Sequence, residues 1–158
     1  MTERAIQLPL GEGTIDVELP GCSVTIAEPP GGKPVDARAA AQRALADPIG
    51  PALEELVAPD DEIAIVVTDI TRATPDGELV DVLLASLEEI GVAREQVTIV
   101  VGLGLHRPMT DTELETMLGE HAELAINHDP DDTVTVGVVD GVDIECNRRV
   151  VDADSVHS

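Results

Sequence analysis

Two short polar stretches contain the side chains of this sequence that are best suited to chemistry. Residues 68–75 read TDITRATP and bring Asp69, Ile70, Thr71 and Arg72 together in consecutive positions. A carboxylate, a hydroxyl and a guanidinium at this spacing can bind an anion, because arginine holds a phosphate or carboxylate through two parallel hydrogen bonds. The structural alternative is that Asp69 caps the following helix and pairs with Arg72.

The second stretch, residues 102–109, reads GLGLHRPM. A histidine ordinarily titrates near neutral pH, so His106 is suited to moving a proton as a general acid or base. Gly102 and Gly104 permit close approach of the backbone to a ligand, and Arg107 with the proline after it orients the turn. The structural alternative is a histidine that only hydrogen-bonds its own loop. The glycine patterns of a P-loop or a dinucleotide-binding fingerprint are missing.

Both stretches follow apolar runs that are typical of buried parallel strands. The runs are EIAIVVTD, residues 62–69, and QVTIVVGLG, residues 96–104, and a helical pattern at 77–90 joins them. This order predicts a β-α-β unit, in which both polar stretches leave the carboxyl edge of the sheet, where ligands bind in such folds. We therefore expect the two loops to be neighbours, with His106 and Arg72 facing one hollow.

The remaining pattern predicts one α/β domain with a Rossmann-like, mostly parallel sheet flanked by helices and a β-rich N-terminal portion. We expect residues 1–35 to be strands that pack on a main domain, residues 36–158. The predicted hairpin and strands are 5–20, 23–29, 123–130, 132–140 and 142–151; the predicted helices are 36–46, 52–57, 77–90 and 111–118. The 77–90 helix is expected to bury Leu79, Val82, Leu83, Leu87 and Ile90. Thr110 and Glu113 form a capping box for the helix at 111–118, which should stop at Gly119.

Composition narrows the classes of function. The 158 residues include 9 basic and 32 acidic side chains, a net charge of -23, and no aromatic residue. The charge opposes binding to nucleic acid, and bases have no aromatic ring on which to stack. Such an excess of Asp and Glu with a single lysine, Lys33, favours a halophilic protein whose self-repulsion is screened by salt. A merely acidic protein from ordinary conditions is the alternative.

The cysteines and the hydropathy of the sequence indicate no functional site. Cys22 and Cys146 show no metal-binding spacing and are expected to be buried, reduced thiols, with a disulfide as the minor alternative. No stretch approaches the ~20 apolar residues of a membrane span, and the N-terminus lacks a signal pattern. These observations predict a cytoplasmic protein with no membrane or nucleic-acid partner.

The other histidines are weak candidates. His128 could bind a metal with the acidic side chains that follow it, but a solvated acidic turn is favoured; those side chains are Asp129, Asp131 and Asp132. His121 follows the predicted helix stop and His157 lies in the terminal tail, so neither is assigned a role. Arg148 and Arg149 either neutralise a carboxylate or a bound anion, or form a surface ion pair.

The segments DITRATP, GLGLHRPMTDTEL, INHDP and ECNRRVVDAD, in this order, resemble the N-terminal domain of the nickel-dependent lactate racemase family. That family shows an Asp-x-Thr-Arg-x-x-Pro loop and a Gly-x-His-Arg-Pro-x-Thr turn at similar separation. The resemblance covers nearly the whole chain and is firmest from about residue 46 onward.

The resemblance implies a nickel-pincer nucleotide cofactor bound between two domains. It implies an enzyme that moves a hydride from the α-carbon of a 2-hydroxy acid to the cofactor and back, while two histidines exchange the hydroxyl proton. His106 matches the first of these histidines. The loop from Asp69 through Ile70 and Thr71 to Arg72 matches the cofactor-contacting loop, and Arg72 and Arg107 are candidates for holding the anionic substrate.

The family's second histidine, its cofactor-anchoring lysine and its nickel-binding histidine belong to a later region. Neither Lys33 nor His157 matches those positions, so no metal ligand is assigned here. The chain is therefore expected to need a C-terminal domain or segment, in cis or in trans, and to be inactive by itself. The alternative function is a non-catalytic nucleotide- or anion-binding module of the same fold.

Overall fold

The computed structural model describes residues 5–11, 13–27 and 31–158. The chain divides into two compact units, Met1–Pro34 and Val35–Ser158, and each is described by itself. The predicted docking of the N-terminal strands on the main domain remains a prediction.

The first unit is a β-hairpin of strands β1 (Ala5–Leu10) and β2 (Gly13–Glu18), as predicted. The antiparallel register pairs Leu8 with Ile15, and Gly11 has the positive φ of 58° that this tight connection needs. The strand predicted at 23–29 is wrong for residues 23–27, which form no strand, and residues 28 and 29 lie outside the described residues. Alternating apolar residues do not make a strand unless another strand pairs with them.

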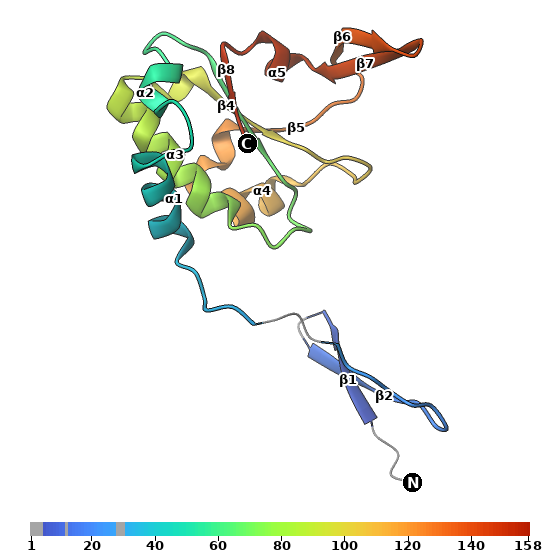
Figure 1. Cartoon of the computed structure of the whole chain (residues 1–158). Helices are drawn as coiled ribbons and strands as arrows, with labels where there is room; N and C mark the ends of the chain where they lie inside the picture. The colour runs from blue at the N-terminus through green and yellow to red at the C-terminus, as the bar shows by residue number, and fades with distance from the viewer. Residues whose placement is uncertain (1–4, 12, 28–30) are drawn as a thin grey trace. The chain divides into compact units, whose positions relative to one another are not determined.

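The second unit is built on a four-stranded parallel sheet in the order β5-β4-β3-β8 (Figure 1). The predicted β-α-β unit is its centre. Strands β3 (Ile63–Val67) and β4 (Val97–Val101) pair in parallel, with Ile65 opposite Ile99, and helix α3 (Asp76–Ile90) connects them. The α/β fold class predicted from the sequence is confirmed.

The first helix begins, and the helix α3 ends, at the caps expected from the sequence. Asp36 accepts the Ala39 N–H at 2.9 Å and starts the first helix, while Gly91 ends α3 with a φ of 106°. The first helix is α1 (Ala37–Ala46), and the other helical elements up to residue 124 are α2 (Leu53–Leu56), α4 (Asp111–Leu118) and the short 3₁₀ turns η1 (Arg94–Gln96) and η2 (Gly119–Leu124). On α4 the predicted capping box between Thr110 and Glu113 is present.

The buried face of α3 differs from the expectation in one turn. Val80, which was not expected to be buried, is 2 % exposed, whereas Leu79 is 37 % exposed. Val82 and Leu87 are buried as expected, whereas Leu83 and Ile90 are only partly buried. The apolar stripe therefore faces the sheet through Val80 and Leu87, two helical turns apart, and Leu79 lies beside it.

The aliphatic core lies between the sheet and α3 and α4. Its buried members include Ile65, Val80, Leu87, Ile99 and Leu114. Helix α3 also packs closely on α4 at Gly77, where a Cβ atom would lie 2.6 Å from the Met117 carbonyl oxygen. A side chain at this position would push the two helices apart.

The C-terminal third differs from the sequence prediction in two places. Strands β5 (Ala125–Asn127), β6 (Thr133–Val139) and β7 (Val142–Asn147) form where three strands were predicted, and β6 and β7 make an antiparallel hairpin. The predicted continuation of the last strand to residue 151 is wrong. Asn147 accepts the Arg149 N–H at 2.9 Å and starts helix α5 (Arg148–Asp152) instead.

The expected terminal tail is also an element of the sheet. Strand β8 (Ser155–His157) pairs in parallel with β3, with His157 opposite Ile65. Burial lowers the pKa of His157. Cys22 and Cys146 are free, but Cys22 is exposed, so the prediction that both thiols are buried is wrong. None of the described helices has the length and apolar character needed to cross a membrane.

Candidate functional site

The two polar loops meet at the carboxyl edge of the sheet. One follows β3 and the other follows β4, and these strands are parallel neighbours. The Nδ1 atom of His106 lies 2.5 Å from the Oδ2 atom of Asp69, across 37 positions of sequence. The prediction that the loops are neighbours is therefore confirmed.

Asp69 is the buried anchor of this contact. The residue is only 4 % exposed, and its Oδ1 atom accepts hydrogen bonds from the Thr71 N–H at 2.9 Å and the Thr71 hydroxyl at 2.5 Å. These bonds from Thr71, followed by the bond from His106, lower the pKa of Asp69 from 3.8 to about 2. The carboxylate is therefore charged at neutral pH.

The structural alternative for Asp69 is wrong. The residue at the N-cap of α3 is Pro75. The Arg72 backbone N–H donates to the Asp69 carbonyl at 3.0 Å, but no ion pair between the two side chains occurs among the described residues. The Asp69 carboxylate instead accepts hydrogen bonds from Thr71 and His106.

The carboxylate of Asp69 fixes the orientation of the His106 ring. An ionised carboxylate only accepts hydrogen bonds, so Nδ1 is the donor, and in the neutral ring the lone pair is on Nε2. The side chain is 46 % exposed, so the ring is open to a ligand. It borders a hollow of about 370 Å³ whose other lining residues include Ile70, Thr71, Leu105, Arg107, Met109 and Glu113.

The turn that carries His106 is held at its base. The Gly102 N–H donates to the Val67 carbonyl of β3 at 2.8 Å, and the His106 N–H donates to the Leu103 carbonyl at 3.0 Å. Gly104 has a φ of 57°, in the left-handed region that glycine adopts without strain. The glycines noted in the sequence therefore shape the turn.

Arg107 is engaged within the chain. Its guanidinium donates to both carboxylate oxygens of Glu113, at 2.7 and 2.8 Å, and to the Pro108 carbonyl at 2.9 Å. This ion pair, with the Thr110 N–H, lowers the pKa of Glu113 from 4.5 to about 2. A role of Arg107 in substrate binding remains a prediction, and it would require the guanidinium to share or exchange its partner.

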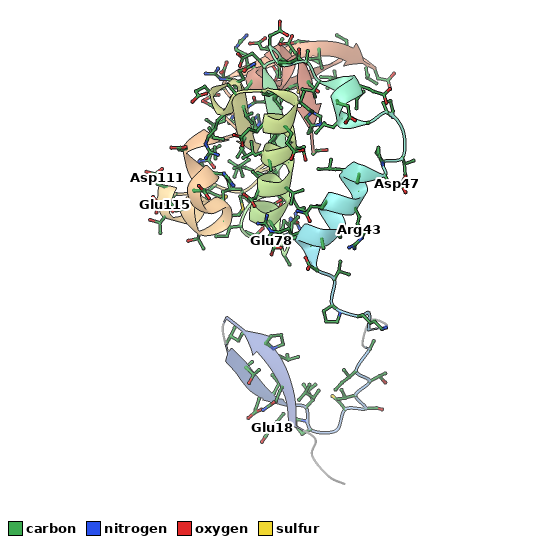
Figure 2. The ribbon with its side chains drawn as sticks, turned by 90° about the vertical axis from the view of Figure 1, so that its left-hand side faces the viewer. Glu18, Arg43, Asp47, Glu78, Asp111 and Glu115 are labelled. Atoms are coloured by element: carbon green, nitrogen blue, oxygen red, sulfur yellow. The ribbon has the colours of Figure 1, made fainter. Side chains whose placement is uncertain are left out.

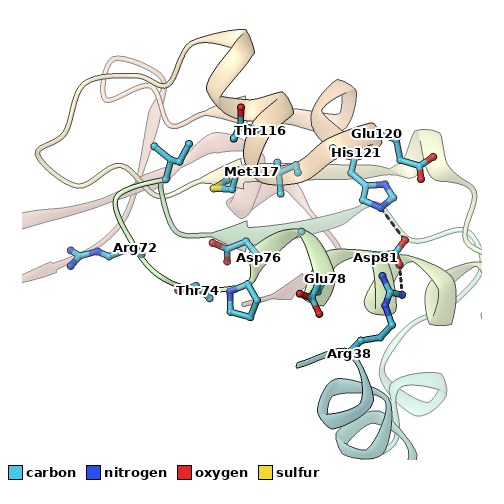
Figure 3. A pocket seen from close by; sticks show the side chains of 15 residues that line it. Arg38, Arg72, Thr74, Asp76, Glu78, Asp81, Thr116, Met117, Glu120 and His121 are labelled. Carbon is cyan, nitrogen blue, oxygen red and sulfur yellow. Dashed lines mark hydrogen bonds and ion pairs between the residues drawn. The ribbon is translucent and has the colours of Figure 1, made fainter. Parts of the chain in front are cut away.

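Arg72 lies apart from His106. It borders a different hollow, of about 550 Å³, and Ile70 borders both hollows. Figure 3 shows Arg72 at one end of its hollow, on the loop that leads into α3. The expectation that His106 and Arg72 face one hollow is wrong for this chain by itself, because the loop turns between Asp69 and Arg72.

His121, which the sequence analysis left without a role, is buried at the other end of the Arg72 hollow. Its Nε2 lies 3.2 Å from the Asp81 carboxylate, and its Nδ1 lies 3.1 Å from the Arg94 guanidinium. Asp81 also pairs with Arg38 of α1 (Figure 3). These contacts connect η2, α3 and α1, so the histidine has a structural role that only its distant partners reveal.

His128 and the acidic turn after it do not assemble a metal centre. The His128 Nδ1 atom lies 3.0 Å from the Asn147 amide nitrogen, and Asp132 pairs with Arg148 at 2.7 Å. Within the described ranges no three His, Cys, Asp or Glu side chains form a group that could hold a metal ion. Of the two interpretations of Arg148, the exposed ion pair is the one that the structure contains.

Sequence reasoning missed one residue beside the site. Asn127, the last residue of β5, bonds both backbone groups of Met109, at 2.9 Å each. The only signal was its place in the INHDP segment, next to His128.

The fold and the site define a class of protein: a parallel α/β domain with an aspartate-oriented histidine at the carboxyl edge of its sheet. Residues 10–157 match the family described as the lactate racemase N-terminal domain. The chain belongs to this family.

Two known proteins are similar to this chain. Lactate racemase of Lactiplantibacillus plantarum is 31% identical over 121 residues, which cover 72% of this chain and 28% of the relative. The structure of the lactate racemase apoprotein from Thermoanaerobacterium thermosaccharolyticum matches 97% of this chain and 38% of that chain, with a TM-score of 0.70 and 23% identity. The second match confirms the fold. The chain thus spans less than half the length of either relative.

Proposed function

We propose that this chain is the N-terminal, cofactor-contacting domain of a nickel-dependent racemase or epimerase of 2-hydroxy acids. The observation that carries the proposal is the contact between His106 and Asp69 at the mouth of a hollow. Membership of the lactate racemase N-terminal domain family supports the reaction class. The cytoplasmic location expected from the sequence belongs to the same proposal.

His106 is the general acid and base in this proposal. Its Nε2 lone pair accepts the proton of the substrate hydroxyl, which converts the ring to an imidazolium, and it returns the proton in the reverse step. Asp69 holds Nδ1–H and stabilises the imidazolium, because its own charge persists at neutral pH. The nickel-pincer nucleotide, when bound, supplies the acceptor and donor for the hydride of the α-carbon.

The fit to such a cofactor is partial. The loop from Asp69 through Ile70 and Thr71 to Arg72 leads towards the N-terminus of the 15-residue helix α3, and Arg72 is exposed on it. A guanidinium close to a helix N-terminus suits the phosphate of a nucleotide. The described residues contain no group of ligands for nickel, so we assign the metal ligands to the rest of the protein.

The C-terminal part of the enzyme, in cis or in trans, is the expected partner. The chain spans 28% of the lactate racemase relative, so most of the residues that would enclose the substrate belong elsewhere. We assign the substrate carboxylate to Arg107 or Arg72, because a protein with a net charge of -23 needs a local cation to hold an anion. By itself the chain is expected to be inactive.

A non-catalytic nucleotide- or anion-binding module is the second candidate. The observation that favours it is the separation of Arg72 from His106 into two hollows, since an anion at Arg72 would not by itself meet the histidine. The two candidates differ in whether His106 is needed for anything beyond folding.

One experiment separates them. The full-length protein, loaded with cofactor, is incubated with the separate enantiomers of lactate and of longer 2-hydroxy acids, and the products are resolved by chiral chromatography. The enzyme proposal expects interconversion of at least one pair, lost in His106→Ala while nickel content is retained. Normal interconversion in His106→Ala would remove His106 from the chemistry. Full nickel loading with no interconversion of any pair would favour the binding module.

A further inference from the structure

Asn127 forms a two-point clamp on the turn that carries His106. The Met109 N–H donates to its Oδ1 at 2.9 Å, and its Nδ2 donates to the Met109 carbonyl at 2.9 Å. Asn127 lies opposite Val101 in the register of β4 and β5, which is the last pair between these strands. Beyond this last pair, the Asn127 side chain donates one hydrogen bond to the Met109 backbone and accepts one from it, as a neighbouring strand would do.

The segment between the clamp and His106 is short and stiff. Only Arg107 and Pro108 separate His106 from Met109, and the proline ring fixes its own φ. The Arg107 guanidinium bonds the Pro108 carbonyl and Glu113, which restrains the segment further. A displacement of the Met109 backbone therefore passes directly to the His106 ring.

Packing of the Met109 side chain does not replace the clamp. The residue is 5 % exposed and belongs to the core, but contacts between apolar side chains have no preferred direction. The two hydrogen bonds of Asn127 are directional, and they fix how the peptide groups on either side of Met109 are turned.

We infer that Asn127 is a positioning residue for His106. Its amide sets the orientation of the Met109 backbone, and the turn then presents the His106 Nδ1 atom to Asp69 and leaves Nε2 open. The catalytic meaning of this inference rests on the proposed function. The geometric part concerns only residues of this chain and can be tested without cofactor or substrate.

The test is the tautomer of His106 in the full 158-residue chain, read from long-range ¹H–¹⁵N NMR correlations of its imidazole. In the neutral ring, the bond to Asp69 favours the Nδ1–H form. In Asn127→Ala the ratio of Nδ1–H to Nε2–H forms should fall about fivefold, the change expected when one ordinary hydrogen bond is lost.

Gln96→Ala is the matched control. The Gln96 side-chain amide also bridges backbone groups, donating to the Pro59 and Asp61 carbonyls at 3.1 and 2.9 Å, but it lies outside the two loops of the site. Its loss should lower stability and leave the His106 tautomer as in the wild type. A purely structural role for Asn127 would move the melting temperature in both variants and the tautomer in neither.

Asn127→Asp covers the case in which the alanine variant does not fold. The aspartate still accepts from the Met109 N–H but cannot donate to the Met109 carbonyl, so a smaller shift of the tautomer ratio in the same direction is expected. A wild-type ratio in the folded variants, or an equal shift in Gln96→Ala, would overturn the inference. If the ratio shifts but the full-length protein interconverts no 2-hydroxy acid, the positioning role stands and the proposed function fails.

Discussion

The imidazole of His106 is hydrogen-bonded to the carboxylate of Asp69, with 2.5 Å between Nδ1 and Oδ2. The two residues follow different strands, and the carboxylate is buried whereas the ring is 46 % exposed. The negative charge of Asp69 lies at the Nδ1 side of the ring, and in the neutral ring the free lone pair is on Nε2, at the opposite side. Its consequences can be tested by changing one partner at a time.

In the proposed racemase, Asp69→Asn should reduce interconversion of 2-hydroxy acids roughly 10²–10⁴-fold, the usual contribution of a general acid or base. The asparagine amide is neutral, so it no longer stabilises the imidazolium, and its NH₂ group can impose the Nε2–H tautomer. Chiral chromatography of the product measures the rate.

Asp76→Asn is the control for burial of an aspartate near the same loop. Asp76 is 6 % exposed and accepts from the Thr68 hydroxyl at 2.8 Å, but among the described residues it forms no hydrogen bond with His106. This variant should leave the His106 tautomer unchanged. A wild-type rate in Asp69→Asn would show that the carboxylate is dispensable for the chemistry.

Acid should unfold the chain partly through Asp69 and Glu113. Hydrogen bonds lower the pKa of each to about 2 in the folded state, from 3.8 for Asp69 and 4.5 for Glu113. Because the folded state binds these protons less tightly, the stabilisation is present above about pH 4.5 and is lost as the pH falls towards about 2. Asp76 acts in the opposite direction, since burial raises its pKa.

Urea unfolding between pH 6 and 2.5 measures this dependence. Glu113→Gln should make the loss of stability with falling pH shallower than in the wild type, because one of the two groups no longer titrates. An acid limb as steep as that of the wild type would contradict the assignment of Glu113.

Local signals in the sequence predicted the centre of the fold. The β-α-β unit follows from two apolar runs around a helical pattern, and the capping box of α4 follows from Thr110 and Glu113. Local signals could not predict the features that depend on residues far away in the sequence. Strand β8 is three residues long and forms because β3 lies beside it, and the role of His121 depends on Asp81, which lies 40 positions earlier.

The candidate site was predictable to a similar degree. Parallel strands end at one edge, so the two loops had to be neighbours. Which side chains touch was not predictable, because it depends on the path of each loop: a tight turn at Asp69 directs Arg72 to another hollow, and Gly104 turns the chain before His106. The only local signal for Asn127 was its place in the INHDP segment.

In the proposed nickel-dependent enzyme, Arg72→Ala should lower the nickel and cofactor content of the purified protein about tenfold, the effect of losing a charge-assisted hydrogen bond to an anion. Stability should stay within about 0.5 kcal/mol, since the side chain is exposed. Arg43→Ala, which removes an exposed arginine of α1 (Figure 2), is the control for charge alone. Unchanged cofactor content in Arg72→Ala, measured by metal analysis, would remove Arg72 from the cofactor site.

Gly77→Ala should destabilise the second unit by ~1–3 kcal/mol, the usual cost of overpacking. The added Cβ would lie 2.6 Å from the Met117 carbonyl oxygen, and a backbone atom cannot move aside alone. Gly137→Ala is the matched control, because its Cβ would meet no atom within 4 Å. Urea unfolding measures both. Equal stability of the two variants would mean that α3 and α4 separate without cost.

Salt should stabilise the chain, because its net charge of -23 repels itself at low ionic strength. Asp111 and Glu115, both exposed on α4 (Figure 2), illustrate the effect: like charges four residues apart on a helix cost ~0.2–0.5 kcal/mol. Glu115→Gln should therefore raise the melting temperature at low salt and make it respond less to KCl than the wild type does. If the melting temperature of the wild type is the same in dilute buffer and in ~1 M KCl, where the Debye length falls to about 3 Å, repulsion between these charges does not limit stability and adaptation to salt is not supported.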